Sequence, residues 1–233
     1  MNKNDLRFLK KDKPDYTKED VILLNKGCPL NYIIGYVDFL NVRINLNHKV
    51  LIPRPETEYW VSKMLPNIKS EKPMILDMFC GSGCIGISIL KNNPNAHVIF
   101  SDINENAILQ TKENLKFNEI DETRYEIIKS DLFENISKKF DYIFANPPYV
   151  GINDKVGDEI KHEPRLAIYA NDNGFAIIKK FLIKAKFFLN PSGVIFMEFG
   201  SNQKEKLAEF VVNNYSVKFL RDQYHRFRLA ILS

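Results

Sequence analysis

ILDMFCGSGCIG, at residues 75–86, is the stretch that decides the fold class of this 233-residue chain. It begins as an apolar run and enters a turn with Gly81, Gly83 and Gly86, after which a helical pattern starts. Glycine tolerates positive φ angles and lets the backbone approach a ligand closely. A glycine-rich turn between a strand and a helix is typical of nucleotide-binding α/β proteins, in which ligands bind at the carboxyl ends of the strands.

An acidic residue, Asp102, ends the next apolar run and adds to this signal. Its carboxylate can accept hydrogen bonds from both hydroxyls of a ribose. The spacing Gly81-x-Gly83-x-x-Gly86, followed about 20 residues later by an acid, also fits the dinucleotide-binding fingerprint of dehydrogenases. A turn that packs a helix on a strand without any ligand is a third interpretation. Other parts of the chain must therefore identify the cofactor.

Strand and helix patterns alternate along the chain from residue 74 onward. This alternation predicts an α/β fold with a mostly parallel, Rossmann-like sheet of seven strands covered by helices on both faces. The last two runs, 216–222 and 227–233, are joined by too few residues for a crossover helix, so the last strand is expected to be antiparallel. The other strand-like runs are 74–79, 97–102, 125–131, 141–149 and 193–200.

The segment before this alternation divides into smaller parts. Residues 1–28 are polar and predict one or two short helices, too few residues to bury a core of their own. Residues 29–52 contain alternating apolar and polar side chains, which predict a linker and, from about residue 30, a β-hairpin. Pro55 favours the start of a helix. Residues 53–233 are expected to form the α/β domain.

The tetrapeptide Asn146-Pro147-Pro148-Tyr149 follows the apolar run DYIFA and is the strongest chemical signal in the chain. The prolines remove two backbone donors, which leaves nearby carbonyls with fewer local partners. The Asn146 side-chain oxygen and the Pro147 carbonyl can then accept both hydrogens of one NH2 group. Tyr149 can cover one face of a flat substrate group. A plain turn at a strand end is the alternative interpretation.

An amide or aromatic amine nitrogen is a poor nucleophile because its lone pair is delocalised. Two acceptors that hold both of its hydrogens let the nitrogen become tetrahedral as it attacks, so positioning and electrostatics can drive methyl transfer from a sulfonium. This chemistry makes S-adenosylmethionine the expected cofactor. Asp131 could then meet the adenine, and Asp77 could either orient the glycine-rich loop or meet the methionine part.

Composition limits the other classes of function. The formal net charge of +4 is too small to indicate nucleic-acid binding by itself. The three cysteines, Cys28, Cys80 and Cys84, lack a metal-ligand spacing, so we expect no metal site, no disulfide framework and a reducing, cytoplasmic location. No apolar run approaches the roughly 18 residues of a membrane-spanning helix.

From about residue 28 onward the chain resembles the peptide chain release factor glutamine methyltransferases, the PrmC/HemK family. LIPRPETE at 51–58, NPPY at 146–149 and HEPRLAIYANDNG at 162–174 carry the resemblance. NPPY alone is shared with DNA adenine methyltransferases, whereas its combination with PRPETE is specific. The resemblance implies S-adenosylmethionine-dependent methylation of the glutamine amide in the Gly-Gly-Gln motif of a release factor.

The resemblance also implies roles for individual residues. Asn146, Pro147 and Tyr149 are expected to act in catalysis, with Pro148 completing the substrate slot. Two departures stand out. Phe79 occupies a position where the family often has glycine, and only about 28 residues precede the linker where the family has a helical domain that helps to grip the release factor. The expected cofactor contacts are Arg54, Thr57, Asp77, Phe79, Cys80, Gly81, Ser82, Gly83, Asp102, Ile103, Asp131, Leu132 and Asn146.

Three alternatives to release factor methylation stay open at this level. The same chemistry could act on adenine in DNA or on a glutamine of a ribosomal protein, and the chain could bind the cofactor without turnover. Glu198 ends a strand-like run near the expected site, where it could support the site or serve a plain buried role. Trp60 is expected in the core or as a contact over the site.

Overall fold

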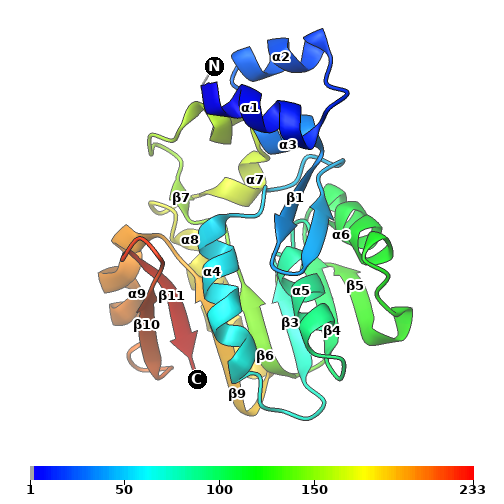
Figure 1. Ribbon diagram of the computed structural model, residues 1–233. Coiled ribbons are helices and arrows are strands. Elements are labelled where there is room, and N and C mark those ends of the chain that lie inside the picture. The colour runs from blue at the N-terminus through cyan, green and yellow to red at the C-terminus, as the bar shows by residue number, and fades with distance from the viewer. Residues whose placement is uncertain (1–2) are drawn as a thin grey trace.

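A seven-stranded sheet runs through the computed structural model, which describes residues 3–233 (Figure 1). Its strands are β3 (Met74–Met78), β4 (His97–Asp102), β5 (Tyr125–Lys129), β6 (Phe140–Ala145), β9 (Leu189–Glu198), β10 (Val217–Arg221) and β11 (Phe227–Leu232). The strand order is β10-β11-β9-β6-β3-β4-β5. Strand β11 is antiparallel to both of its neighbours, and the other pairs are parallel. The predicted fold class is confirmed.

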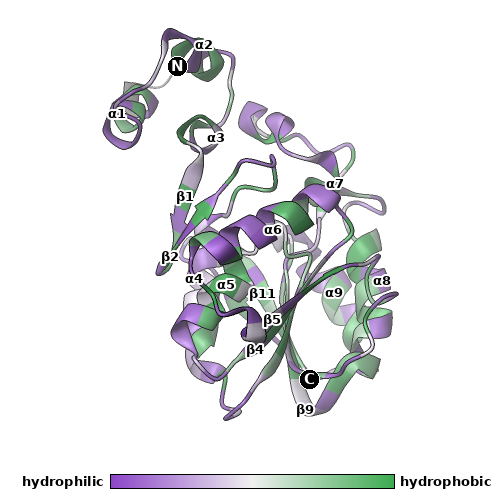
Figure 2. Ribbon diagram, turned by 90° about the vertical axis from the view of Figure 1, so that its right-hand side faces the viewer, coloured by the Kyte–Doolittle hydropathy of each residue, from purple (hydrophilic) through white to green (hydrophobic). Residues whose placement is uncertain are grey.

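Helices cover both faces of this sheet (Figure 2). One face carries α4 (Pro55–Met64), α5 (Cys84–Asn92) and α6 (Glu105–Phe117), and the other carries α8 (Ala176–Ala185) and α9 (Lys204–Val211). Each face has its own buried apolar cluster, one including residues of α4, α5 and α6 and the other including residues of α8 and α9. Strands buried on both faces explain why the sequence shows continuous apolar runs rather than alternation.

The strand register brings three loops to one edge of the sheet. Met78 at the end of β3 pairs with Ser101 of β4 on one side and with Ala145 of β6 on the other. The glycine-rich loop, Asp102 and Asn146 follow these positions directly, so the parallel strands deliver them to the same edge. This is the edge at which ligands bind in open α/β sheets.

The N-terminal helices α1 (Lys3–Asp12), α2 (Lys18–Asn25) and α3 (Leu30–Ile34) lie together at one end of the molecule (Figure 1). Leu9, Leu24 and Ile33 form a small apolar cluster between them. The hairpin consists of β1 (Tyr36–Phe39) and β2 (Val42–Asn45). The prediction of a hairpin from about residue 30 is therefore wrong for the first residues, because packing of Ile33 against α1 and α2 favours a helical turn there.

The segment between β6 and α8 contains short elements that the sequence pattern did not predict. Strand β6 ends at Ala145 rather than continuing to Tyr149, because the two prolines cannot donate to a ladder. The segment contains β7 (Val150–Gly151), α7 (Arg165–Ile168) and β8 (Tyr169–Ala170).

Short 3₁₀ helices occur at several places along the chain. They are η1 (Leu65–Asn67), η2 (Glu122–Arg124), η3 (Asp158–His162), η4 (Lys186–Phe188) and η5 (Ser201–Gln203).

Candidate active site

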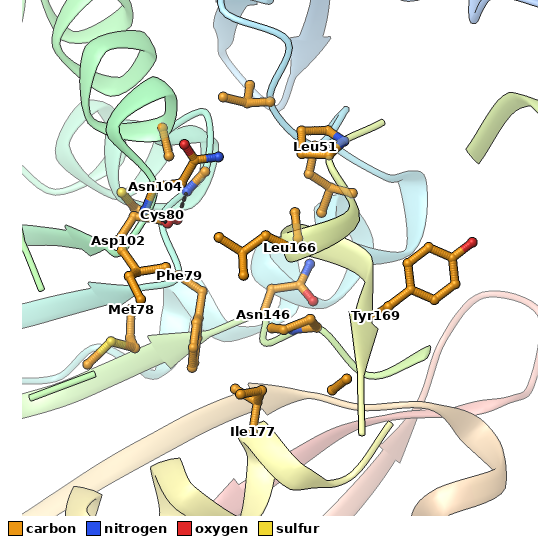
Figure 3. Close-up of a pocket in the computed structure, with 18 of the residues that line it drawn as sticks. Leu51, Met78, Phe79, Cys80, Asp102, Asn104, Asn146, Leu166, Tyr169 and Ile177 are labelled. Atoms are coloured by element: carbon orange, nitrogen blue, oxygen red, sulfur yellow. Dashed lines mark hydrogen bonds between the residues drawn. The ribbon is translucent and has the colours of Figure 1, made fainter. Parts of the chain in front are cut away.

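A cavity of about 510 Å³ opens at the carboxyl edge of the sheet (Figure 3). The loop after β3, the segment before α4 and the region around α7 form its walls. Its size lies within the range of pockets that hold small molecules and cofactors. In the view of Figure 3, Asn146 lies below Leu166 of α7, with Phe79 on its left and Tyr169 on its right.

The glycine-rich loop is held in an unusual backbone conformation. Phe79 has a φ of 61°, in the left-handed region that favours glycine. Its ring packs edge-on against Phe181 of α8, with 5.7 Å between the ring centroids. The aromatic packing offsets the backbone strain of about 1–2 kcal/mol that a left-handed φ costs a residue other than glycine.

Asp102 anchors the loop at the end of β4. Its carboxylate accepts hydrogen bonds from the backbone N–H of Gly81 at 3.0 Å and of Asn104 at 2.9 Å. Burial raises the pKa of Asp102, and the backbone N–H groups partly oppose this. From α6, Asn114 binds the Ser82 carbonyl at 2.9 Å. The loop and the acid are thus one preorganised unit that faces the cavity.

Asp77 lies behind the loop, is fully buried and is not part of the cavity wall. One carboxyl oxygen accepts a hydrogen bond from the Gly86 N–H at 2.9 Å, and the other has no partner among the described residues. Burial raises the pKa of Asp77 to about 8. Asp77 thus contacts the first turn of α5, and its role in orienting the glycine-rich loop stays a prediction.

This pKa leads to a prediction about stability. Between about pH 4 and pH 8 the native state holds a proton on Asp77 that the unfolded state has released, so the free energy of unfolding falls as pH rises. The slope contributed by this group is at most about 1.4 kcal/mol per pH unit. Asp77→Asn should remove this contribution, so that the variant gains stability relative to the wild type from pH 5 to pH 8. Urea unfolding of both proteins across that range measures it, and parallel pH profiles would contradict it.

The NPPY segment lies between two cavities. Asn146 and Pro148 line the large cavity, whereas Asn146, Pro147 and Tyr149 line a second cavity of about 80 Å³. The two cavities share Asn146 and Arg54 among their lining residues. A small group in the second cavity would therefore lie next to a larger molecule in the first.

A buried carboxylate, Glu198 at the end of β9, is part of the wall of the small cavity. One of its oxygens accepts hydrogen bonds from the Thr57 hydroxyl at 2.6 Å and the Trp60 indole N–H at 2.8 Å. The other accepts from the Tyr149 hydroxyl at 3.0 Å. Burial raises the pKa of Tyr149, so this phenol remains a donor. Arg228 of β11 in turn donates to the Tyr149 oxygen at 3.3 Å.

Comparisons with known proteins identify the chain as similar to methyltransferases. Residues 57–164 match the family model described as "Methyltransferase small domain". The chain is 34% identical over 210 residues to a release factor glutamine methyltransferase of Streptococcus pneumoniae, covering 88% of this chain and 74% of that protein. A protein of the same name from Lactococcus lactis is 34% identical over 200 residues, covering 84% of this chain and 73% of its own length.

The chain belongs to the release factor glutamine methyltransferase family. The family resemblance seen in the sequence is thus confirmed. Among solved structures, a methyltransferase from Pyrococcus furiosus superposes with a TM-score of 0.63 at 17% identity, covering 93% of this chain and 98% of that one. That likeness supports the fold.

Two of the segments that carry the resemblance to the family meet at the cavity through an ion pair. Arg54, in PRPETE, pairs with Glu163, in HEPR, and the other Glu163 oxygen accepts a hydrogen bond from the Ile52 N–H at 2.9 Å. Glu163 is buried. The pairing holds the chain before α4 over the cavity. No local sequence pattern indicates it, because 109 residues separate the partners.

The structure brings most of the sequence-predicted site residues to one place. Four do not line the large cavity. Asp77 accepts a hydrogen bond from α5, Gly83 is the N-cap residue of that helix, and Pro147 and Tyr149 line the small cavity. Glu163 and Arg228 were missed. For Glu163 the available signal was a carboxylate directly before a proline. For Arg228 it was an arginine inside an apolar run. The predicted residues in the large cavity are Arg54, Thr57, Phe79, Cys80, Gly81, Ser82, Asp102, Ile103, Asp131, Leu132, Asn146 and Pro148.

The two cysteines beside the glycine-rich loop are not activated as nucleophiles. Burial raises the thiol pKa values of Cys80 and Cys84, so neither is a thiolate nucleophile at neutral pH. Across residues 3–233 no group of three or more His, Cys, Asp or Glu side chains is arranged to hold a metal ion. In the same range no helix is both long and apolar enough to cross a membrane.

Proposed function

We propose that this chain transfers a methyl group from S-adenosylmethionine to the glutamine side-chain amide in the Gly-Gly-Gln motif of peptide chain release factors. Membership of the family supports the substrate and the cofactor. The observation that carries the chemistry is the position of Asn146 at the junction of a cofactor-sized cavity and a much smaller one. In this proposal the large cavity holds the cofactor and the small cavity holds the amide.

The residues of the large cavity fit the cofactor. Asp102 offers carboxylate oxygens to the ribose, and Asp131 lies on the cavity wall for the adenine amino group. Ile103 and Leu132 add apolar surface for the flat base, although Ile103 is 44% exposed in the structure described here. Helix α5 begins at Cys84 without a side-chain cap, and the Gly86 N–H of its first turn donates to Asp77. The backbone N–H groups of Cys84 and Ile85 are then the first-turn donors for the carboxylate of the cofactor. S-adenosylmethionine supplies an electrophilic methyl group on a sulfonium.

The chain's own residues prepare the substrate nitrogen. We assign the two hydrogens of the glutamine NH2 to the Asn146 side-chain oxygen and the Pro147 carbonyl. Both acceptors act in a partly buried site, where hydrogen bonds are stronger than in water. They hold the nitrogen in line with the methyl group and stabilise the positive charge that develops as the N–C bond forms and the C–S bond breaks, with its electron pair going to sulfur. One of the two hydrogens of the nitrogen then leaves as a proton to water. Tyr149, fixed by Glu198 and Arg228, closes one face of the slot.

The test is methylation of a release factor with its Gly-Gly-Gln glutamine intact or replaced by glutamate. Label from S-adenosylmethionine should enter the intact protein and be lost from the glutamate variant, since a carboxylate has no hydrogens for two acceptors. Mass spectrometry of the motif peptide should place the added methyl group on the glutamine. Label that persists in the glutamate variant would refute the assigned position.

Two other acceptors serve as controls within the same assay. Duplex DNA and ribosomal proteins should stay unlabelled under conditions in which the release factor is labelled. If DNA were labelled and the release factor were not, adenine in DNA would replace the release factor glutamine as the proposed methyl acceptor. The same proposal divides the chain into three working units, residues 1–28, 29–52 and 53–233. It also places the protein in the cytoplasm.

A further inference from the structure

Glu198 occupies an unexpected place for a carboxylate. It is 1% exposed and ends a strand whose preceding residues, Ile195, Phe196 and Met197, are all buried and apolar. Burying a carboxylate is costly unless hydrogen bonds surround it. Three side chains donate to it, and two of them belong to the segments PRPETE and NPPY. This arrangement links the two segments through one buried group.

The direction of these hydrogen bonds is fixed by the chemistry of the partners. The indole N–H of Trp60 is a donor only, so the Glu198 oxygen that it contacts is an acceptor. The Thr57 hydroxyl, 2.6 Å from the same oxygen, therefore gives its hydrogen to Glu198. The lone pairs of the Thr57 oxygen are left to accept from another group.

That other group is the side-chain amide of Asn146. Its nitrogen lies 3.4 Å from the Thr57 oxygen and donates to it. The reverse orientation would place the amide oxygen against the lone pairs of Thr57, which is repulsive. The chain of bonds thus holds the NH2 of Asn146 toward Thr57 and frees its oxygen. The contact is long, as catalytic hydrogen bonds often are before the substrate binds.

We propose that Glu198, acting through Thr57, is a positioning residue that selects the orientation of the Asn146 amide. The inference rests on the proposed function, in which only the oxygen of Asn146 can accept a hydrogen from the substrate NH2. An amide rotated by half a turn would present its own NH2 to the substrate NH2, donor against donor. Thr57, at 1% exposure, lies in the wall of the large cavity but has its hydroxyl engaged by this chain of bonds.

The test compares Thr57→Ser, which keeps the hydroxyl, with Thr57→Ala, which lacks it; both lack the methyl group. Loss of one orienting hydrogen bond should lower kcat of Thr57→Ala by about tenfold. Thr57→Ser should recover most of that loss. Affinity for S-adenosylmethionine, measured by calorimetry, should be the same in both variants. A kcat of Thr57→Ser as low as that of Thr57→Ala would overturn the proposal, as would a loss confined to cofactor affinity.

A second readout needs neither turnover nor substrate. In protein labelled with ¹⁵N-asparagine, the side-chain NH2 signals of Asn146 are those that vanish in Asn146→Ala. These signals should shift and exchange faster in Thr57→Ala and in Thr57→Val, and stay near the wild-type positions in Thr57→Ser. Unchanged signals in the Ala and Val variants would refute the orienting bond. If the signals shift in the Ala and Val variants while the wild-type protein fails to label a release factor, the orienting bond stands and only the proposed function is refuted.

Discussion

Asn146→Ala is expected to lower kcat for release factor methylation by on the order of 10²–10³-fold, comparable to removing one preorganised group from a catalytic site. Alanine removes one of the two acceptors for the substrate NH2, so the nitrogen is no longer held in the geometry that it needs to attack. The effect should appear in kcat rather than in cofactor affinity. The measurements are single-turnover methylation and calorimetric titration with S-adenosylmethionine.

Asn146→Asp is the matched variant for this experiment. Its carboxylate keeps an acceptor near the substrate but cannot donate to Thr57. It should therefore lose less activity than the alanine variant while still falling below the wild type. Full activity of Asn146→Ala would rule out the side chain as an acceptor, and equal losses in both variants would rule out the acceptor as the reason for its importance.

The parallel core of the fold could be predicted because its signals are local. The run 97–102 has an apolar, buried centre at Val98, Ile99 and Phe100 and coincides with β4. Such a continuous apolar stretch is typical of a strand covered on both faces. Secondary structure was predicted less accurately where tertiary packing determines it. Residues 30–34 share the alternation of the hairpin, yet Ile33 joins an apolar cluster with Leu9 and Leu24 and the chain turns helical. No local pattern contains that tertiary contact.

The same distinction holds for the candidate site. The glycine-rich loop, Asp102 and NPPY each follow a strand, so their gathering at one edge follows from a parallel sheet alone. The supporting contacts do not. Arg54 and Glu163 are 109 residues apart, and Thr57 and Glu198 are 141 residues apart. A sequence shows that such charged or polar residues are present, but their pairing depends on the three-dimensional arrangement of loops.

Backbone strain is a further feature of the site that could not be predicted from the residue types. Phe79 and Leu132 both adopt positive φ values, 61° and 51°, and both line the large cavity. Non-glycine residues persist in this region when the surrounding packing overdetermines them, and such positions gather at functional sites. Phe79 therefore adopts a backbone conformation that favours glycine, although it is a phenylalanine.

Gly174→Ala is expected to cause the largest loss of stability of any single methyl addition considered for this chain. Gly174 has a φ of 83°, and a Cβ there would lie 1.9 Å from the Tyr149 carbonyl oxygen and 2.9 Å from the Gln203 side-chain nitrogen. That nitrogen itself donates to the Tyr149 carbonyl at 3.0 Å. The left-handed backbone and the clash together should reduce the free energy of unfolding by about 3–5 kcal/mol. Because the clash falls on Tyr149, kcat should fall as well.

Two other glycines separate the causes. Gly157→Ala adds a Cβ with nothing within 4 Å and at an ordinary φ, so its stability should match the wild type. Gly35→Ala meets nothing within 4 Å but has a φ of 94°, so it should lose only the backbone term of about 1–2 kcal/mol. Urea unfolding of the three variants gives the order directly. If Gly174→Ala were no less stable than Gly35→Ala, the tip of NPPY could yield to the added methyl group. The close approach of residue 174 would then not be what fixes the substrate slot.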